Sequence, residues 1–209
     1  MDFEYNEKYF KRHYSAPFYR RYVDFRNRFI KNEITKFVCS GRFLEIGFGD
    51  DNLIKFFKND FEVFGVDISE IAVEKIKEQY EPSHFQICDV SRQKIPFEQK
   101  FDVIAALNVI EHLENPKLAF KNIYESLKEK GIFVIYLPTQ NNFFSKIQYK
   151  IFYDAKEHIF RPSIKNLRNI LKDLGLKACK ECAASFIPLK INNEFFLELF
   201  NLYFGLWQK

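Results

Sequence analysis

The chain has 209 residues, 47% of them hydrophobic, and its 32 basic and 28 acidic residues leave a net charge of +4. This size suits one α/β domain with a sizeable core, and so mild a charge gives no support for a nucleic-acid-binding protein. Four cysteines without dense spacing indicate a reducing compartment, and the sequence shows neither a signal peptide nor the roughly 18 apolar residues of a transmembrane helix, so we expect a cytoplasmic protein.

Residues 1–40 are expected to form a helical cap. Apolar side chains recur at steps of three to five from Pro17 to Val38, before Gly41, which predicts one long amphipathic helix. Its opposite face carries five basic residues, interpreted first as a solvated surface. The alternative is that the leader and this helix close over a ligand and supply substrate contacts from Tyr9, Arg12 and Tyr14.

An apolar run ending at Ile46 predicts a buried strand that leads into a turn containing Gly47 and Gly49, and residues 52–58 suit a helix. Because glycine has no Cβ, such a unit lets the backbone approach a nucleotide-like ligand, and the helix start favours an anionic group. The third glycine of a dinucleotide fingerprint is absent, since Asn52 stands there. An ordinary glycine turn is the alternative interpretation.

Two further strands are predicted to end in acidic residues. Residues 61–66 lead to Asp67, and residues 85–90 form a short strand with Asp89 near its end. A carboxylate at the end of the second strand can accept hydrogen bonds from both ribose hydroxyls of a nucleoside ligand. Ser69 is a good N-cap for the helix predicted between these strands.

The next elements are a fourth strand over residues 101–107 and the segment 108–116, which reads NVIEHLENP. A helix is expected from Pro116 to Glu129, with Gly131 at a C-cap position, followed by a fifth strand over residues 132–137.

These stretches together resemble class I S-adenosylmethionine (SAM)-dependent methyltransferases. Glu45, Gly47 and Gly49 match the family's first motif, E/D-x-G-x-G-x-G, in which Asp51 replaces the third glycine. FDVI at 101–104 and EHLENP at 111–116 resemble the "FD-x-I … E-H-hydrophobic-x-x-P" signature of the small-molecule branch. The resemblance covers residues 42–138 closely and continues loosely to about 178. It implies an α/β fold with a Rossmann-like sheet flanked by helices.

The resemblance implies SAM as cofactor and S-adenosylhomocysteine (SAH) as product. Asp67 would bind the ribose, Ile68 would pack on the adenine, and Asp89 with the Val90 backbone would face the adenine amine. The cofactor-binding residues implied in this way are Glu45, Gly47, Phe48, Gly49, Asp67, Ile68, Asp89, Val90, Leu107, Asn108 and His112.

Methyl transfer from a sulfonium is a direct displacement, so positioning supplies most of the catalysis and only a hydroxyl acceptor needs a base. His112 and His158 are the candidate catalytic residues. The alternatives are packing against the cofactor for His112 and a structural loop role for His158. No metal is expected, because no clustered His, Asp and Glu set is visible.

Residues 138–160 are predicted to form a long irregular connection. The resemblance implies that this is the region in which the family builds much of its acceptor pocket. Together with the leader it supplies the candidate substrate residues, which are Tyr9, Arg12, Tyr14, Asn141, Tyr149 and Tyr153. A helix ending at Gly175 and a strand over 176–183 follow.

The last segment, 186–209, is rich in aromatic residues and poor in charges, and a seventh strand is hard to find there. We expect this tail to cover the core or to form a homodimer; a membrane-surface helix is the alternative, although its polar face lacks Lys and Arg. Without repeats or linkers, residues 1–209 are expected to form one methyltransferase domain with a cap (1–40), a core (41–185) and a tail (186–209).

The expected function is methyl transfer to an oxygen of a small polar acceptor, such as a sugar, a nucleotide-linked or a surface-glycan precursor. The alternatives are a quinone or lipid phenol as acceptor, or a catalytically silent SAM-binding partner subunit. Nucleic acid is not expected as a substrate, because base methyltransferases of this fold often carry N/D-P-P-Y/F after strand four, where this chain reads NVIE.

Overall fold

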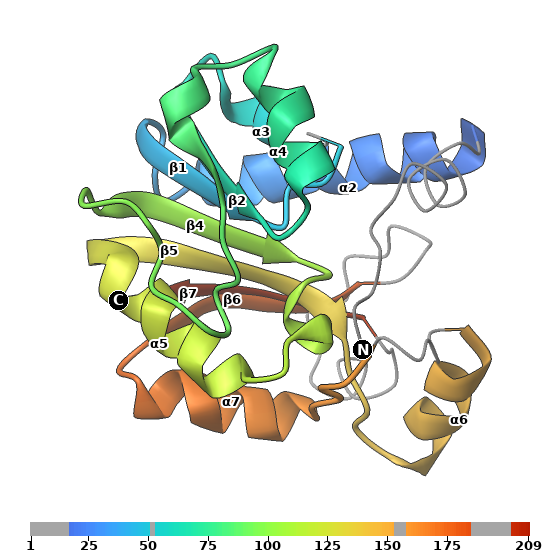
Figure 1. The fold of residues 1–209 in the computed structure, drawn as a ribbon. Helices are drawn as coiled ribbons and strands as arrows, with labels where there is room; N and C mark the ends of the chain where they lie inside the picture. The colour runs from blue at the N-terminus through green and yellow to red at the C-terminus, as the bar shows by residue number, and fades with distance from the viewer. Residues whose placement is uncertain (1–16, 51–52, 153–157, 185–201) are drawn as a thin grey trace.

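The computed structural model describes residues 17–50, 53–152, 158–184 and 202–209, drawn in colour in Figure 1. A seven-stranded sheet forms the centre, in the order β3-β2-β1-β4-β5-β7-β6. Strands β1 to β5 pair in parallel, and β7 lies antiparallel between β5 and β6. This sheet confirms the predicted fold class. The strands are β1 (Gly41–Ile46), β2 (Phe61–Asp67), β3 (Phe85–Ile87), β4 (Phe101–Leu107), β5 (Leu127–Pro138), β6 (Lys177–Ala184) and β7 (Leu202–Gln208).

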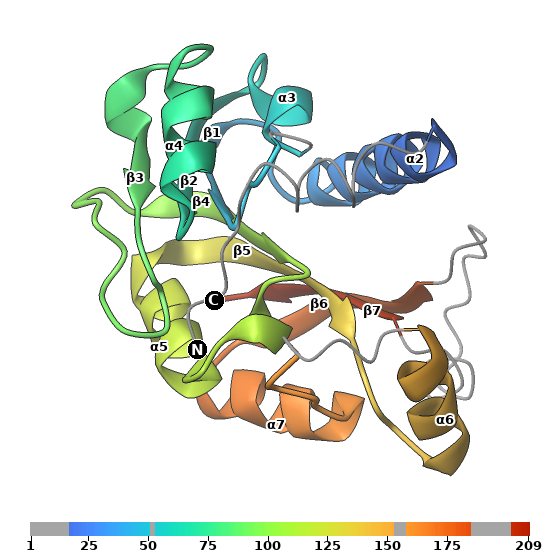
Figure 2. The same cartoon turned by 45° about the vertical axis from the view of Figure 1, so that its right-hand side comes forward.

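Helices cover both faces of the sheet (Figures 1 and 2). Helices α2, α3 and α4 lie on one face and α5 and α7 on the other, while α6 stands beyond the end of β5. The helices are α2 (Pro17–Ile34), α3 (Ile54–Phe57), α4 (Glu70–Lys77), α5 (Pro116–Ser126), α6 (Phe143–Phe152) and α7 (Ile164–Asp173), with short 3-10 turns η1 (Pro82–His84) and η2 (Ile110–His112).

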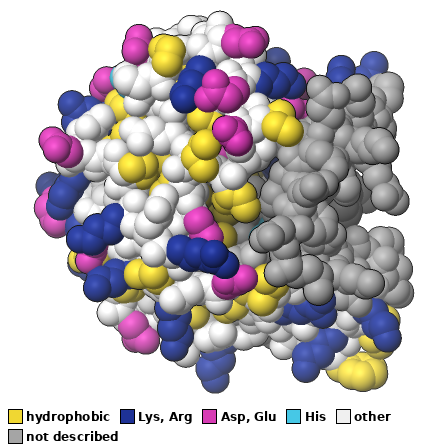
Figure 3. All heavy atoms as spheres, in the orientation of Figure 1, with side chains coloured by type: hydrophobic (Ala, Val, Ile, Leu, Met, Phe, Trp, Pro, Cys, Tyr) yellow, Lys and Arg dark blue, Asp and Glu magenta, His cyan; other side chains and the backbone are white. Residues whose placement is uncertain are grey.

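Side chains that alternate along the strands build one apolar core on each face of the sheet. In β4, Val103 and Ala105 join the core under α2, α3 and α4, whereas Ile104 and Ala106 join the core under α5 and α7. Because both faces are covered, the central strands read as continuous apolar runs. On the face shown in Figure 3, basic and acidic side chains are interspersed over the described surface.

The helix expected over residues 116–129 is shorter than predicted. It ends at Ser126, and Leu127 already begins β5. The strand then turns at Lys130, which has a φ of 65°, and its pairing with β4 shifts register before Ile132. A Cβ on Gly131 would lie 2.9 Å from the carbonyl oxygen of Lys128, so this glycine serves an irregularity of the strand and not a helix cap.

The connection over residues 138–160, predicted to be irregular, contains helix α6. The Asn142 side chain accepts a hydrogen bond from the backbone N–H of Ser145 at 2.8 Å, which is the N-cap geometry that the sequence reading overlooked. Smaller differences concern element ends: α2, α3, α4 and β3 are all shorter than the predicted 17–38, 52–58, 70–79 and 85–90.

The end of the aromatic tail is a core strand. Residues 202–207 are buried, and β7 pairs with a strand on each side. Trp207 Nε1 donates to Tyr203 Oη at 3.0 Å, and Tyr203 Oη donates to Glu181 Oε1 at 2.6 Å. For these residues burial supports the expected core-covering role. The membrane-surface helix is wrong here, because they form a strand, and a homodimer through the tail stays a prediction. A strand buried on both faces shows no polar alternation, so its sequence resembled an apolar surface segment.

Residues 186–201 of the tail lie outside the described part of the chain. Among the helices that are described, none combines the length and apolar character needed to cross a membrane.

Asn122 of α5 holds the loop that follows β3 in place through hydrogen bonds. Its side chain is buried, and Nδ2 donates to the carbonyl oxygens of Val90 at 3.0 Å and Gln93 at 2.8 Å. Both carbonyl groups lie in the loop that carries Asp89, so the position of this acidic residue depends on α5.

We expect Asn122→Ala to lower the free energy of unfolding by about 1–3 kcal/mol, because two carbonyl groups lose their buried donor. Urea denaturation followed by circular dichroism measures the change. Lys121→Ala, at an exposed position on the same helix, is the matched control. A loss in Asn122→Ala no larger than that in the control would contradict this role.

Candidate active site

The turn after β1 has the glycine conformation that the sequence predicts. Gly47 and Gly49 have φ values of 68° and 53°, in the left-handed region that favours glycine. The backbone N–H of Gly47 donates to the carbonyl oxygen of Val66 at 2.7 Å. A Cβ on Gly47 would lie 2.4 Å from Val109 Cγ2, so the turn also needs glycine to pack against the loop after β4.

Two other residues of the first motif, Glu45 and Phe48, support this turn with buried side chains. Glu45 is buried, and its Oε2 accepts a hydrogen bond from the backbone N–H of Ile54 at 3.2 Å, at the start of α3. The Phe48 ring packs in the core against Phe85, with ring centroids 5.6 Å apart. Asp51, the residue that departs from the motif, lies outside the described residues.

Asp67, at the end of β2, connects two turns through its carboxylate. Oδ2 accepts from the N–H of Gly49 at 3.0 Å, and Oδ1 accepts from the N–H of Ser69 at 2.9 Å. Burial raises the pKa of Asp67 above its ordinary value, while these backbone N–H groups act in the opposite direction. The carboxylate is thus fixed at the carboxyl edge of the sheet, beside the glycine turn.

Exposed apolar residues lie close to Asp67 in the chain and in the neighbouring strand. Ile68 is 51% exposed, and Ile71 and Ile87 are exposed to a similar extent. Ile87 is the register partner of Asp67 in the neighbouring strand β3. An exposed apolar side chain at the carboxyl edge of the sheet is suited to packing against a flat ring of a ligand. Only Ile68 was predicted from the sequence; the pairing of β2 with β3 was needed to find Ile87.

Asp89 and Val90 follow β3 at the same edge. Asp89 Oδ1 accepts from both the N–H and the hydroxyl of Ser91, at 2.9 and 2.7 Å. The Val90 side chain is buried, so only its backbone could face a ligand; the adenine contact implied by the resemblance stays a prediction. These bonds hold the loop in one conformation, together with Asn122.

The loop after β4 completes this edge. Leu107 is nearly buried at the strand end, and Asn108, which is exposed, has a φ of 53°. The N–H of Asn108 donates to the carbonyl oxygen of Tyr136 at 2.7 Å. Asparagine tolerates this left-handed conformation better than most residues, and the resulting bend sends the chain into η2, which contains Glu111 and His112.

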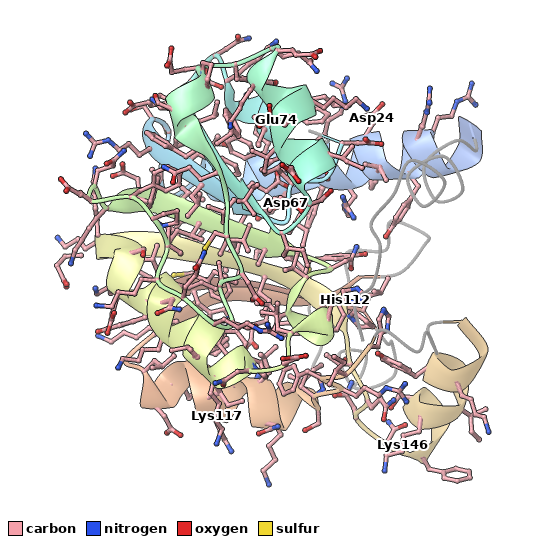
Figure 4. The ribbon with its side chains drawn as sticks, viewed as in Figure 1. Asp24, Asp67, Glu74, His112, Lys117 and Lys146 are labelled. Atoms are coloured by element: carbon pink, nitrogen blue, oxygen red, sulfur yellow. The ribbon has the colours of Figure 1, made fainter. Side chains whose placement is uncertain are left out.

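The structure brings His112 and His158 together from distant parts of the sequence. Their ring centroids lie 4.7 Å apart in an edge-to-face arrangement. The Tyr149 hydroxyl and His158 Nδ1 form a hydrogen bond at 2.8 Å, and Arg161 Nε donates to the carbonyl oxygen of His158 at 3.0 Å. Figure 4 shows His112 and Asp67 where the chain leaves the carboxyl ends of β4 and β2.

Glu111 is a residue of this site that was not among the candidates predicted from the sequence. It is only 1% exposed, and burial raises the pKa of its carboxyl group to about 8. Its backbone carbonyl accepts from the N–H of Phe160 at 2.9 Å, which joins η2 to the segment carrying His158. No sequence spacing could place this carboxyl beside His158.

The remaining substrate candidates have mixed outcomes. Asn141 Oδ1 accepts from the N–H of Ile164 at 2.8 Å, so its described role is to join the connection to α7. Tyr149 is buried and orients His158. Four of the candidates lie outside the described residues; these are Tyr9, Arg12, Tyr14 and Tyr153.

A family model described as "Methyltransferase domain" matches residues 11–181. A comparison with curated proteins found no match. Among solved structures, the chain is similar to a SAM-dependent methyltransferase from Archaeoglobus fulgidus, with 20% identity, a TM-score of 0.68, and coverage of 99% of this chain and 100% of that chain.

It is also similar to an S-adenosylmethionine-dependent methyltransferase from Clostridium acetobutylicum, with 15% identity, a TM-score of 0.68 and 96% of each chain covered. A magnesium protoporphyrin IX methyltransferase from Synechocystis with bound SAH matches at 15% identity and a TM-score of 0.65, over 100% of this chain and 90% of that chain. These structural likenesses show a shared fold.

We expect Gly47→Ala to lower the free energy of unfolding by more than Gly175→Ala does. Both positions have a positive φ, so both variants lose about 1–3 kcal/mol to backbone strain. Only at position 47 would the new methyl group also clash. A Cβ added at position 175 would have its nearest neighbouring atom 3.4 Å away, which is an ordinary contact.

Adding Val109→Ala to Gly47→Ala tests the clash directly, because it removes the atom that the new methyl group meets. In urea denaturation Gly47→Ala should cost less in the Val109→Ala background than in wild type, leaving only the strain common to both glycines. Equal losses in Gly47→Ala and Gly175→Ala would contradict the role of the Val109 contact.

Proposed function

This chain belongs to the methyltransferase family, and we propose that it transfers a methyl group from SAM to an oxygen atom of a small polar acceptor. The family and the use of SAM follow from the domain match over residues 11–181 and from the shared fold. The oxygen acceptor is our proposal, and the observation that carries it is the pairing of His112 with His158, close in the chain to Val109, which packs against Gly47.

The residues at the carboxyl edge fit the chemistry of SAM. The Asp67 carboxylate, held by two backbone N–H groups, has the acceptor capacity that two ribose hydroxyls require. Ile68 and Ile87 offer exposed apolar surface to the adenine, and the loop of Asp89 offers acceptors for its amine. Gly47 and Gly49, in the left-handed conformation, let the backbone come close to the part of SAM beyond its nucleoside.

SAM supplies an electrophilic methyl group on a sulfonium. The chain therefore needs to bind the donor, exclude water and place the acceptor oxygen in line with the carbon–sulfur bond, which can lower the barrier by several kcal/mol. Backbone strain at Asn108 and the contact of Val109 with Gly47 fix the loop between the donor site and the two histidines. This arrangement favours methyl transfer beside the carboxyl end of β4.

A hydroxyl acceptor must lose its proton as the new bond forms. His112 and His158 are the groups at this place that act on such a proton, and Tyr149 fixes the ring of His158. The polar residues at the edge favour a sugar or nucleotide-linked acceptor. The aromatic tail would suit a quinone or phenol, and the burial of residues 202–207 removes them from that argument.

We expect Asp67→Ala to weaken SAH binding at least about tenfold, because a loss of about 1.4 kcal/mol in binding corresponds to that factor. The variant loses the ribose acceptor and the links to Gly49 and Ser69. Calorimetric titration of SAH measures the dissociation constant, and Glu70→Ala, an exposed acidic residue nearby, is the control. Equal affinity in Asp67→Ala and wild type would place the cofactor elsewhere.

For His158→Ala we expect turnover to fall by about 10²–10⁴-fold, the usual contribution of a proton-transfer group. SAH affinity should stay within about twofold of wild type. The assay is SAH release with the acceptor that gives turnover in a panel of sugars, sugar nucleotides and phenols. His84→Ala is the matched control, because His84 ends η1, just before β3, with Nδ1 near the carbonyl oxygen of Val63.

Turnover that is unchanged in His158→Ala would remove this histidine from the reaction. No turnover with any acceptor, together with intact SAH binding, would favour the alternative of a silent SAM-binding subunit.

A further inference from the structure

We propose that Glu111, His112 and His158 bind a divalent transition-metal cation, and that this cation holds the acceptor oxygen. The cation site stands on the geometry of the three side chains. Its role with the acceptor rests on the proposed function. The sequence predicted no metal site, because Glu111 and His112 come from η2 while His158 lies beyond α6.

The first observation is the closeness of the three ligand groups. One carboxylate oxygen of Glu111 and one ring nitrogen of each histidine all lie within 4.8 Å of one another. Ligand atoms about 2.1 Å from a tetrahedral ion lie about 3.4 Å apart, so a movement of about 1 Å by each side chain would close the site. Imidazole nitrogen with a carboxylate favours ions such as Mn²⁺, Co²⁺ and Zn²⁺ over Mg²⁺, which prefers oxygen ligands.

The second observation is independent of the first. Among the described residues, Glu111 Oε2 is the buried side-chain oxygen or nitrogen atom that has no hydrogen-bond partner. Leaving a buried carboxyl oxygen unpaired costs free energy of about 1–3 kcal/mol or more. A coordinated cation supplies the missing partner, because a carboxylate that is buried needs a positive charge or hydrogen-bond donors.

The surroundings of His158 have the form that metal-binding histidines usually show. A histidine that coordinates through one ring nitrogen commonly forms a hydrogen bond through the other, which fixes the ring. The Tyr149 hydroxyl lies 2.8 Å from His158 Nδ1, which assigns Nε2 to the cation. The bond from Phe160 N–H to the Glu111 carbonyl holds the two ligand-bearing segments against each other.

Three protein ligands leave coordination positions for other molecules, as in catalytic metal sites. An acceptor hydroxyl bound there has a lowered pKa and loses its proton to solvent, so the two histidines act on this proton through the cation and not as bases. Its oxygen then forms the O–CH₃ bond while the S–CH₃ bond breaks, and SAH leaves as a neutral thioether. The site lies two residues after Val109, which touches Gly47, so the bound oxygen is next to the donor turn.

The test uses the full chain after removal of metals and titrates it with Co²⁺ alone, followed by visible absorption, and with Zn²⁺ by calorimetry. We expect one equivalent of each ion to bind, and an equal concentration of Mg²⁺ to leave the Co²⁺ spectrum unchanged. Binding should weaken at least about 100-fold in His158→Ala and in Glu111→Gln, and about tenfold in Tyr149→Phe, the usual size of a supporting-residue effect. Glu111→Gln keeps the side-chain shape, so it guards against a variant that fails to fold.

His84→Ala is the control for an ordinary histidine and should bind Co²⁺ like wild type. No stoichiometric binding by wild type, or equal binding by wild type and His158→Ala, would overturn the cation site. SAH calorimetry on the same samples separates this result from the proposed function, since the donor site does not need the cation. Turnover that persists without bound metal would overturn the role of the cation and leave oxygen methylation standing.

Discussion

The contact between Gly47 and Val109 is the constraint on which the site depends. The two residues follow β1 and β4, which are neighbours in the sheet, and no Cβ fits between their loops. The first loop turns at left-handed glycines and the second bends at Asn108. The chain therefore leaves each strand in a fixed direction at the same edge of the sheet. Asp67 then links the glycine turn to β2, so three loops behave as one unit.

From this unit the two halves of the site point to different chemistry. Asp67, Ile68, Ile87 and the loop of Asp89 offer a carboxylate, apolar surface and polar backbone, which suit a nucleoside. The chain that leaves β4 carries Glu111 and His112 and meets His158, which Tyr149 fixes. In the proposed reaction, one loop of a few residues brings donor and acceptor together, and its conformation decides whether they meet in line.

The gathering of the predicted cofactor residues at one edge of the sheet was predictable from sequence, because its signals are local. Strand ends, glycines and acidic residues that lie close in the chain stay close in a parallel sheet. The acceptor half and β7 were not predictable in this way. His158 meets His112 only because Phe160 N–H pairs with the Glu111 carbonyl, and β7 reaches its place between β5 and β6 by long-range pairing. Burial on both faces also erased the alternation by which strands are recognised.

The most direct test of the central claim is a crystal structure of the full chain with SAH bound. The account predicts both ribose hydroxyls within hydrogen-bond distance of the Asp67 carboxylate, the adenine against Ile68 and Ile87, and the sulfur facing the loop of residues 108–112. SAH bound away from the carboxyl edge of β1, β2 and β4, or with its sulfur turned from that loop, would contradict it.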